Sequence, residues 1–129
     1  MPIELKYLTW VTVLTALLWV PYILNMIMVR GVFDAVGYPA SPKPLAPWAQ
    51  RLKAAHYNAV ENLVVFAALV LIAVVAGVHS PAIAGCASVY FWARAVHAAA
   101  YTFAIPWVRT LAFTVGVGCQ LCVAWHILS

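Results

Sequence analysis

The chain has 129 residues, of which 67% are hydrophobic and only 8% are charged. A soluble domain of this size could not cover so much apolar surface, whereas the hydrocarbon of a bilayer can. The formal charge of +4 does not indicate a nucleic-acid-binding protein, because the Lys and Arg residues are scattered between apolar segments and form no basic stripe. We therefore expect an all-α integral membrane protein that forms one domain, residues 1–129.

Four apolar segments reach the length of about 20 residues that a transmembrane helix needs. They cover approximately residues 5–29, 48–76, 82–103 and 106–128. Pro21 should bend the first span, because a proline inside a helix removes a backbone hydrogen bond. The expected fold is an antiparallel, up-down four-helix bundle in contact with membrane lipid, with both termini on the same side.

The connections between the spans predict the orientation. Residues 31–47 are rich in Gly and Pro and are predicted to be a loop, while residues 77–81 form a tight turn that includes His79. Cytoplasmic loops carry an excess of Lys and Arg. The first connection with its flanks and the third connection hold these residues, so we expect both in the cytoplasm and the termini on the opposite side. In a bacterium this would be the inner membrane.

The cysteines and histidines suggest no separate chemistry. Cys86, Cys119 and Cys122 lie in apolar segments and are expected to be inert thiols, since buried cysteine usually behaves as a small hydrophobe. The C-x-x-C spacing of the last two lacks a strand-turn-helix context. The histidines have no metal-ligand spacing, so no metal is expected.

Charged residues inside the spans are the main functional signal. Arg94 is expected about 14 Å from the cytoplasmic end of its span, where burial costs at least about 2.5 kcal/mol. Glu61 is the one acid that can reach the same depth, because Glu4 belongs to the opposite face and Asp34 to the first connection. We therefore expect Arg94 and Glu61 to pair, within one subunit or between two.

Further polar residues gather in the same leaflet and predict a cationic pocket. Helical spacing places Arg94, His97 and Tyr101 on one stripe. These side chains could simply join helices. However, interhelical polar contacts contribute about 0.6 kcal/mol on average, which offsets little of the free-energy cost of burying an arginine. We favour a ligand that carries carboxylates. The candidate binding residues are Arg30, Asn58, Glu61, Arg94, His97, Tyr101 and Arg109.

Three motifs resemble the family of membrane-associated proteins in eicosanoid and glutathione metabolism, MAPEG, which includes microsomal glutathione transferases. They are Ala-His-Tyr-Asn-Ala-Val-Glu-Asn at 55–62, Arg-Ala-Val-His-Ala-Ala-Ala-Tyr at 94–101 and Pro-Trp-Val-Arg-Thr at 106–110. The resemblance covers nearly the whole chain. It implies a homotrimer that binds glutathione, as co-substrate, between subunits in the cytoplasmic leaflet.

The resemblance also implies roles for individual residues. Asn58 and Glu61 would contact glutathione, Glu61 at the α-amino group, while Arg94, His97 and Tyr101 would hold its carboxylates and backbone. Arg109 would stabilise the thiolate, with Tyr101 as the alternative catalytic residue, and Arg30 matches only loosely. Ala54 is a departure, because many members have an arginine there. Arg51, one turn earlier, is the residue that could replace it.

The implied chemistry is attack of a glutathione thiolate on a lipophilic electrophile that arrives from the bilayer. Transferase, peroxidase and isomerase reactions all remain open. One alternative is a non-catalytic membrane module of the same fold. A less favoured alternative is a small proton-coupled exporter that uses Glu61, because such a protein would not bury Arg94 beside its acid.

Overall fold

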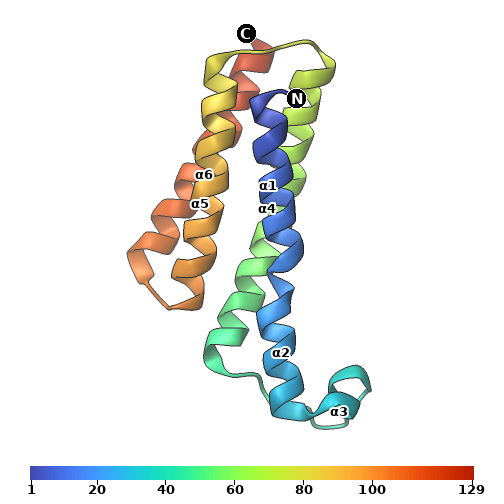
Figure 1. Cartoon of the computed structure of the whole chain (residues 1–129). Helices are drawn as coiled ribbons and strands as arrows, with labels where there is room; N and C mark the ends of the chain where they lie inside the picture. The colour runs from blue at the N-terminus through green and yellow to red at the C-terminus, as the bar shows by residue number, and fades with distance from the viewer.

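The computed structural model describes residues 1–129 and contains helices but no strands, which confirms the all-α prediction. Three helices are long and two more together form one long rod. Figure 1 shows these four helical segments lying side by side, with both termini at the same end. The helices are α1 (Ile3–Leu17), α2 (Trp19–Arg30), α3 (Val32–Val36), α4 (Pro47–Val75), α5 (Pro81–Thr102) and α6 (Pro106–Leu128).

Three helical segments are long and apolar enough to cross a membrane: Ile3–Arg30, Pro47–Val75 and Pro106–Leu128. They correspond to the predicted first, second and fourth spans. The 22-residue helix α5 is not among them, and it carries Arg94 and His97, which lower its mean hydropathy. The predicted third crossing of the membrane therefore stays a prediction.

The first span is interrupted close to the proline that was expected to bend it. Helix α1 ends at Leu17 and α2 begins at Trp19, with Leu18 between them. Pro21 has no N–H to donate to the carbonyl of Leu17, four residues earlier, so the regular hydrogen bonding stops there. The two helices still form one continuous rod in Figure 1.

The other long helices begin where the sequence offers a proline. Pro47, Pro81 and Pro106 each occupy the first turn of their helix, where the missing N–H leaves no hydrogen bond unmade. Helix α5 has a further cap, since the Ser80 hydroxyl accepts a hydrogen bond from the backbone N–H of Ile83 at 3.1 Å. These starts agree with the predicted ones to within a residue.

The first connection is not the continuous loop that was predicted. Residues 32–36 form α3, which is separated from α2 by Gly31 at φ 79°. This left-handed conformation is easily adopted by glycine and rarely by other residues, so the chain can turn sharply between two helices there. Residues 37–46 have no helix or strand.

The core lies where α1, α4, α5 and α6 meet. Tyr90 stacks on Phe66 with ring centroids 3.8 Å apart, and Leu8 and Val11 from α1 pack on the same cluster. On α6, Gly116 lies against Tyr90 and Arg94, as expected for a glycine that permits close packing, whereas Gly118 faces outward. This packing fixes the depth and rotation of Arg94.

The prediction of three inert thiols was wrong for two of the cysteines. Cys86 of α5 and Cys122 of α6 form a disulfide, with Cα atoms 6.8 Å apart, while Cys119 is buried and free. The bonded pair comes from two helices that pack closely along their length, and the C-x-x-C spacing within α6 did not reveal it.

Candidate functional site

Arg94 is the centre of a polar cluster between α4 and α5. Its side chain is only 3% exposed. One of its terminal nitrogens donates to Asn58 Oδ1 at 2.6 Å and lies 3.3 Å from His97 Nδ1. A guanidinium only donates, so Nδ1 must be the accepting nitrogen of the imidazole. The Nε of Arg94 has no partner at all.

His97, Tyr101 and Arg109 continue this cluster toward the end of α5. The rings of His97 and Tyr101 meet edge to face, with centroids 5.7 Å apart. The guanidinium carbon of Arg109, in the first turn of α6, lies 4.7 Å above the Tyr101 ring. This cation–π contact holds an exposed arginine at the mouth of the cluster.

A small pocket of about 190 Å³ opens at this mouth. Arg51, Tyr101 and Arg109 supply its polar lining, and residues of the α5–α6 connection complete it. Ala104 in that connection has φ 57°, a left-handed conformation that is unfavourable for a side chain with a Cβ. The tight connection brings the start of α6, and with it Arg109, over Tyr101.

Arg51 was absent from the candidate binding residues, although its position one turn before Ala54 had marked it as a substitute. Its Nε donates to the carbonyl of Thr102 at 3.0 Å, which ties α4 to the end of α5 and brings the guanidinium beside Arg109. Asn62 and Gln120 were also missed. The Asn62 amide donates to Asn58, and the Gln120 amide donates to the Asn62 carbonyl at 3.2 Å.

Glu61 does not pair with Arg94 within one subunit. Its side chain lies on the exposed face of α4, and the structure contains no ion pair between the two residues. Two residues three positions apart are about 60° apart around a helix axis. Asn58 therefore faces Arg94 while Glu61 points outward, and of the two predicted pairings only the one between subunits remains.

Arg30 is not brought to this cluster either. It ends α2, and its Nε donates to the carbonyl of Lys43 at 2.7 Å in the first connection. Its contact is with the loop and not with Asn58, Arg94 or Tyr101. The remaining predicted residues Asn58, Arg94, His97, Tyr101 and Arg109 form one connected set.

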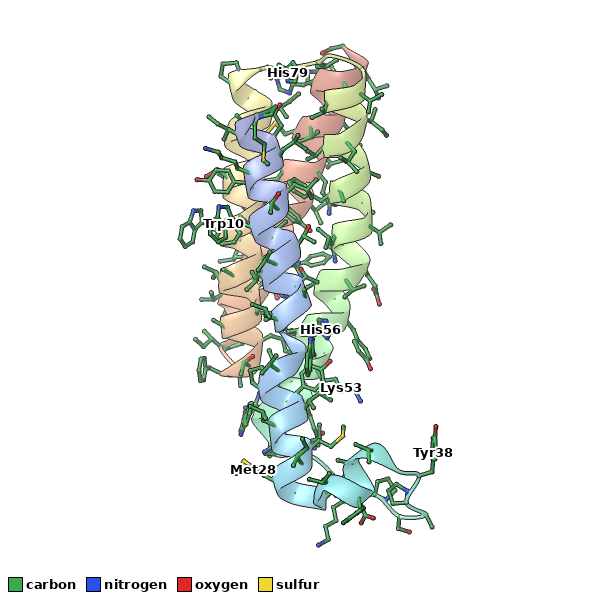
Figure 2. All side chains as sticks on the ribbon, turned by 45° about the vertical axis from the view of Figure 1, so that its right-hand side comes forward. Trp10, Met28, Tyr38, Lys53, His56 and His79 are labelled. Atoms are coloured by element: carbon green, nitrogen blue, oxygen red, sulfur yellow. A yellow bond between two sulfur atoms is a disulfide. The ribbon has the colours of Figure 1, made fainter.

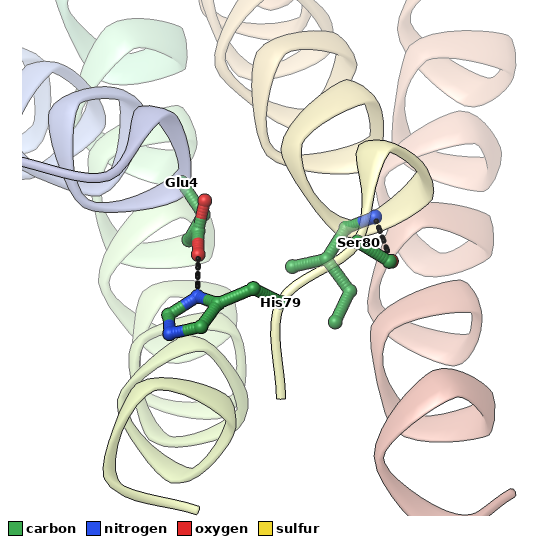
Figure 3. A network of polar contacts seen from close by, with 4 residues as sticks. Glu4, His79 and Ser80 are labelled. Carbon is green, nitrogen blue, oxygen red and sulfur yellow. Dashed lines mark hydrogen bonds and ion pairs between the residues drawn. The ribbon is translucent and has the colours of Figure 1, made fainter. Parts of the chain in front are cut away.

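The opposite end of the molecule has a polar pair of its own. Glu4 Oε1 lies 2.9 Å from His79 Nδ1, with the Glu4 side chain buried and His79 half exposed. Figure 3 shows the two side chains facing each other close to Ser80, which starts α5. The sequence had placed these residues at one face of the membrane but gave no sign that they touch. No group of three or more His, Cys, Asp or Glu side chains could hold a metal ion.

The connected set, together with Arg51 at the pocket, can hold an anion. Three arginines, two of them at a pocket mouth and one buried, face neutral donors and acceptors and have no carboxylate among them. Such a site favours carboxylates and would stabilise a thiolate.

The comparison with known families agrees with this chemistry. No curated protein and no solved structure matches the chain. The sequence model of the MAPEG family matches residues 7–129, nearly the whole chain. The chain therefore belongs to the MAPEG family, a family of membrane proteins that is associated with glutathione metabolism.

Proposed function

We propose that this protein is a glutathione-dependent membrane enzyme of transferase or peroxidase type that acts on lipophilic electrophiles. The observation that carries the proposal is Arg94, a buried cation whose side chain hydrogen-bonds only to the neutral Asn58 and His97. A buried charge without a partner costs several kcal/mol, on the order of what an ion pair recovers. A carboxylate of glutathione would supply the missing anion.

The other members of the set would fix the tripeptide. Asn58 offers an amide and His97 an imidazole beside Arg94, and Tyr101 lies between these deep groups and the surface. Glu61 would meet the α-amino group. Its place on the exposed face of α4 fits a ligand that is bound between two subunits.

The thiolate would form at the pocket mouth. A cysteine thiol titrates near about 8.5, and adjacent positive charge lowers that value and raises the nucleophilic fraction at neutral pH. Arg109 is exposed and lies over Tyr101, and Arg51 lines the same pocket. We assign thiolate stabilisation to Arg109, with Tyr101 as the alternative hydrogen-bond donor.

A homotrimer would complete the site. The pocket of about 190 Å³ is smaller than the roughly 300–1,000 Å³ typical of ligand sites, so one chain does not enclose a tripeptide. Helix α4 also presents an exposed stripe with the 4-3 spacing by which helices pack together. The stripe consists of Tyr57, Glu61, Val64, Ala68, Leu71 and Val75.

The membrane arrangement belongs to the same proposal. We infer that the α1–α2 rod, α4, α5 and α6 each cross the bilayer once. The connection that carries Lys43 and the α5–α6 connection next to Arg109 would lie in the cytoplasm. Both termini would lie on the opposite side, which agrees with their position at one end of the molecule (Figure 1). The cationic pocket would then draw on cytoplasmic glutathione.

Ala54 supports one alternative, a non-catalytic module that keeps the fold. It stands where many members of the family carry an arginine, so one expected cation is absent from α4. Arg51 replaces it only in part, because its Nε is already bonded to Thr102.

Calorimetry with glutathione on the solubilised protein, followed by a rate measurement with a lipophilic model electrophile, tests the proposal. Binding together with thiol consumption supports the enzyme. Binding without turnover leaves the module. No binding heat from the folded protein would overturn the enzyme and also leave the module, because the cationic site would then serve another ligand.

A further inference from the structure

An apolar patch projects from the molecule at the first connection. We call residues 31–46 the α3 segment. This segment packs on α2 and on the start of α4, and within it helix α3 packs on α2 alone. Figure 2 shows Tyr38 pointing away from the helices at the far end of this segment, whereas Met28 lies on the other side of α2. Phe33 is 90% exposed and Tyr38 fully exposed. The patch consists of Val32, Phe33, Val36 and Tyr38.

The lengths of the helices place this patch beyond the hydrocarbon. Helices α5 and α6 have 22 and 23 residues, or about 33–35 Å, close to the roughly 30 Å of a hydrocarbon core. The rod Ile3–Arg30 has 28 residues and α4 has 29, or about 42–44 Å. At the end away from the termini, α2 and α4 extend past the α5–α6 connection (Figure 1).

This overhang amounts to about 8–10 Å, and the headgroup layer on each side of a bilayer is about 5–8 Å thick. The α3 segment therefore lies at the outer edge of the headgroup layer. Aromatic side chains such as Phe33 and Tyr38 are favourable at this depth, since the rings can enter the boundary between lipid and water.

The charges around the patch are mostly positive. Lys43 is exposed, and Arg30 is held beside it by its hydrogen bond to the Lys43 carbonyl. Lys53 lies in the second turn of α4, between the α3 segment and His56 (Figure 2). Asp34 is the one acid of the segment. A second copy of this chain would offer the same cations, whereas an anionic lipid surface complements them.

We propose that the α3 segment docks on the anionic headgroup layer of the leaflet at which α2 ends. Phe33 and Val36 enter the headgroup layer, and Arg30 and Lys43 contact lipid phosphates. This combination of an apolar face with flanking basic residues is how peripheral segments bind membranes. The docking fixes the overhang of α2 and α4 against the bilayer, and it does not depend on glutathione.

Photo-crosslinking tests the proposal. The photoreactive analogue p-benzoylphenylalanine replaces Phe33 in one variant and Ser41 in a control, since Ser41 is exposed in the same segment but lies outside the patch. Both variants keep the native cysteines and are placed in nanodiscs of phosphatidylcholine with or without phosphatidylglycerol. We expect lipid adducts from position 33, few from position 41, and more adducts at 33 when phosphatidylglycerol is present.

The basic residues are tested in the same assay. Lys43→Gln should lower the gain from phosphatidylglycerol by about fivefold, the factor that about 1 kcal/mol per basic residue gives near an anionic surface. The absence of a lipid adduct at position 33 would show that the patch faces water. Equal lipid labelling at positions 33 and 41 would show that the lipid contact is not specific to the patch. A chain-to-chain adduct from position 33 would show that a second copy covers it. Each of these results overturns the proposal.

Discussion

The two ends of the molecule differ in whether their polar side chains find partners within one chain. At the end that holds the termini, Glu4 is paired with His79 and Ser80 caps α5. The disulfide between Cys86 and Cys122 joins α5 to α6 in the same half. At the other end Arg94 has no acid within reach, and Glu61 faces outward without a partner. One end, here the closed end, is complete within a single chain. For the other, here the open end, we propose that a ligand and a neighbouring subunit complete it.

The placement of the acids explains this difference. The chain has three acids against seven Lys and Arg. Glu4 is used at the closed end, Asp34 is exposed in α3, and Glu61 is turned away from Arg94 by the rotation of α4. An excess of positive charge therefore remains at the end that holds Arg94 and the pocket lined by Arg51 and Arg109.

Replacing the buried cation should have the largest effect on binding. Arg94→Met keeps much of the volume and removes the charge. Because an arginine without an acidic partner is costly to bury, we expect thermal stability to be unchanged or higher. Glutathione binding should weaken about 100-fold or more, as expected for the loss of a charge-assisted contact with its neighbours. Calorimetry and a thermal shift measure the two effects.

Arg94→Lys is the matched control for that variant. It keeps the charge but loses the planar fork, so its affinity should fall between the parent and Arg94→Met. If Arg94→Met bound glutathione as tightly as the parent, the ligand would not contact this residue and the open end would need another explanation.

Replacing Arg109 at the mouth of the pocket should lower the reaction rate more than the affinity for glutathione. An arginine that acts mainly on the thiolate matters more once charge develops on sulfur than during binding. We expect Arg109→Ala to lower the conjugation rate about 100-fold and the affinity by less than about fivefold. The ultraviolet absorbance of the thiolate, followed against pH, should show a raised pKa for the bound thiol.

Arg109→Lys retains a positive charge near the thiol and should recover part of the rate. A titration that does not differ between Arg109→Ala and the parent would exclude Arg109 as the activating charge. Tyr101 would then take that role.

A substitution at the closed end should lower the stability of the protein and leave glutathione binding and the reaction rate unchanged. Glu4→Gln removes the charge from a buried hydrogen bond to a half-exposed histidine, so a loss of about 1 kcal/mol is expected. The melting temperature should fall by a few degrees, with glutathione affinity and rate retained. Lys6→Gln, which removes an exposed charge on the same helix, is the control and should change neither. Lost turnover in Glu4→Gln alone would show that the two ends are coupled.

The smallest measurable difference concerns the cysteines. Alkylation of the denatured, unreduced protein should modify Cys119 and leave Cys86 and Cys122 untouched. Mass spectrometry gives the number of modified residues directly. Three modified residues in protein prepared without reductant would show that Cys86 and Cys122 are not joined by a disulfide.

The sequence predicted the helices well because their ends are marked locally. Pro47, Pro81 and Pro106 start helices, and Pro21 interrupts one. The short α3 was missed, because five residues among glycines and prolines give no periodic signal. Most of the polar cluster was predicted as well, since Arg94, His97 and Tyr101 follow one helical stripe and depth alone places Asn58 beside them.

Contacts that depend on the rotation of a helix could not be predicted. Glu61 was expected near Arg94 because it has the right depth, yet about 60° of rotation separates it from Asn58. The pairs Glu4–His79 and Cys86–Cys122 join residues far apart in the chain, and no spacing rule connects them. Arg30 was placed by its depth alone, and its hydrogen bond to Lys43 takes it elsewhere.

Native mass spectrometry of the protein in mild detergent, with and without glutathione, tests most directly whether the open end is completed by a ligand and a neighbouring subunit. We expect the mass of three chains, with glutathione bound to the trimer, and the loss of the bound tripeptide in Arg94→Met with the trimer retained. A folded single chain of 14.1 kDa that binds glutathione, or a trimer that binds none, would contradict this view of the molecule.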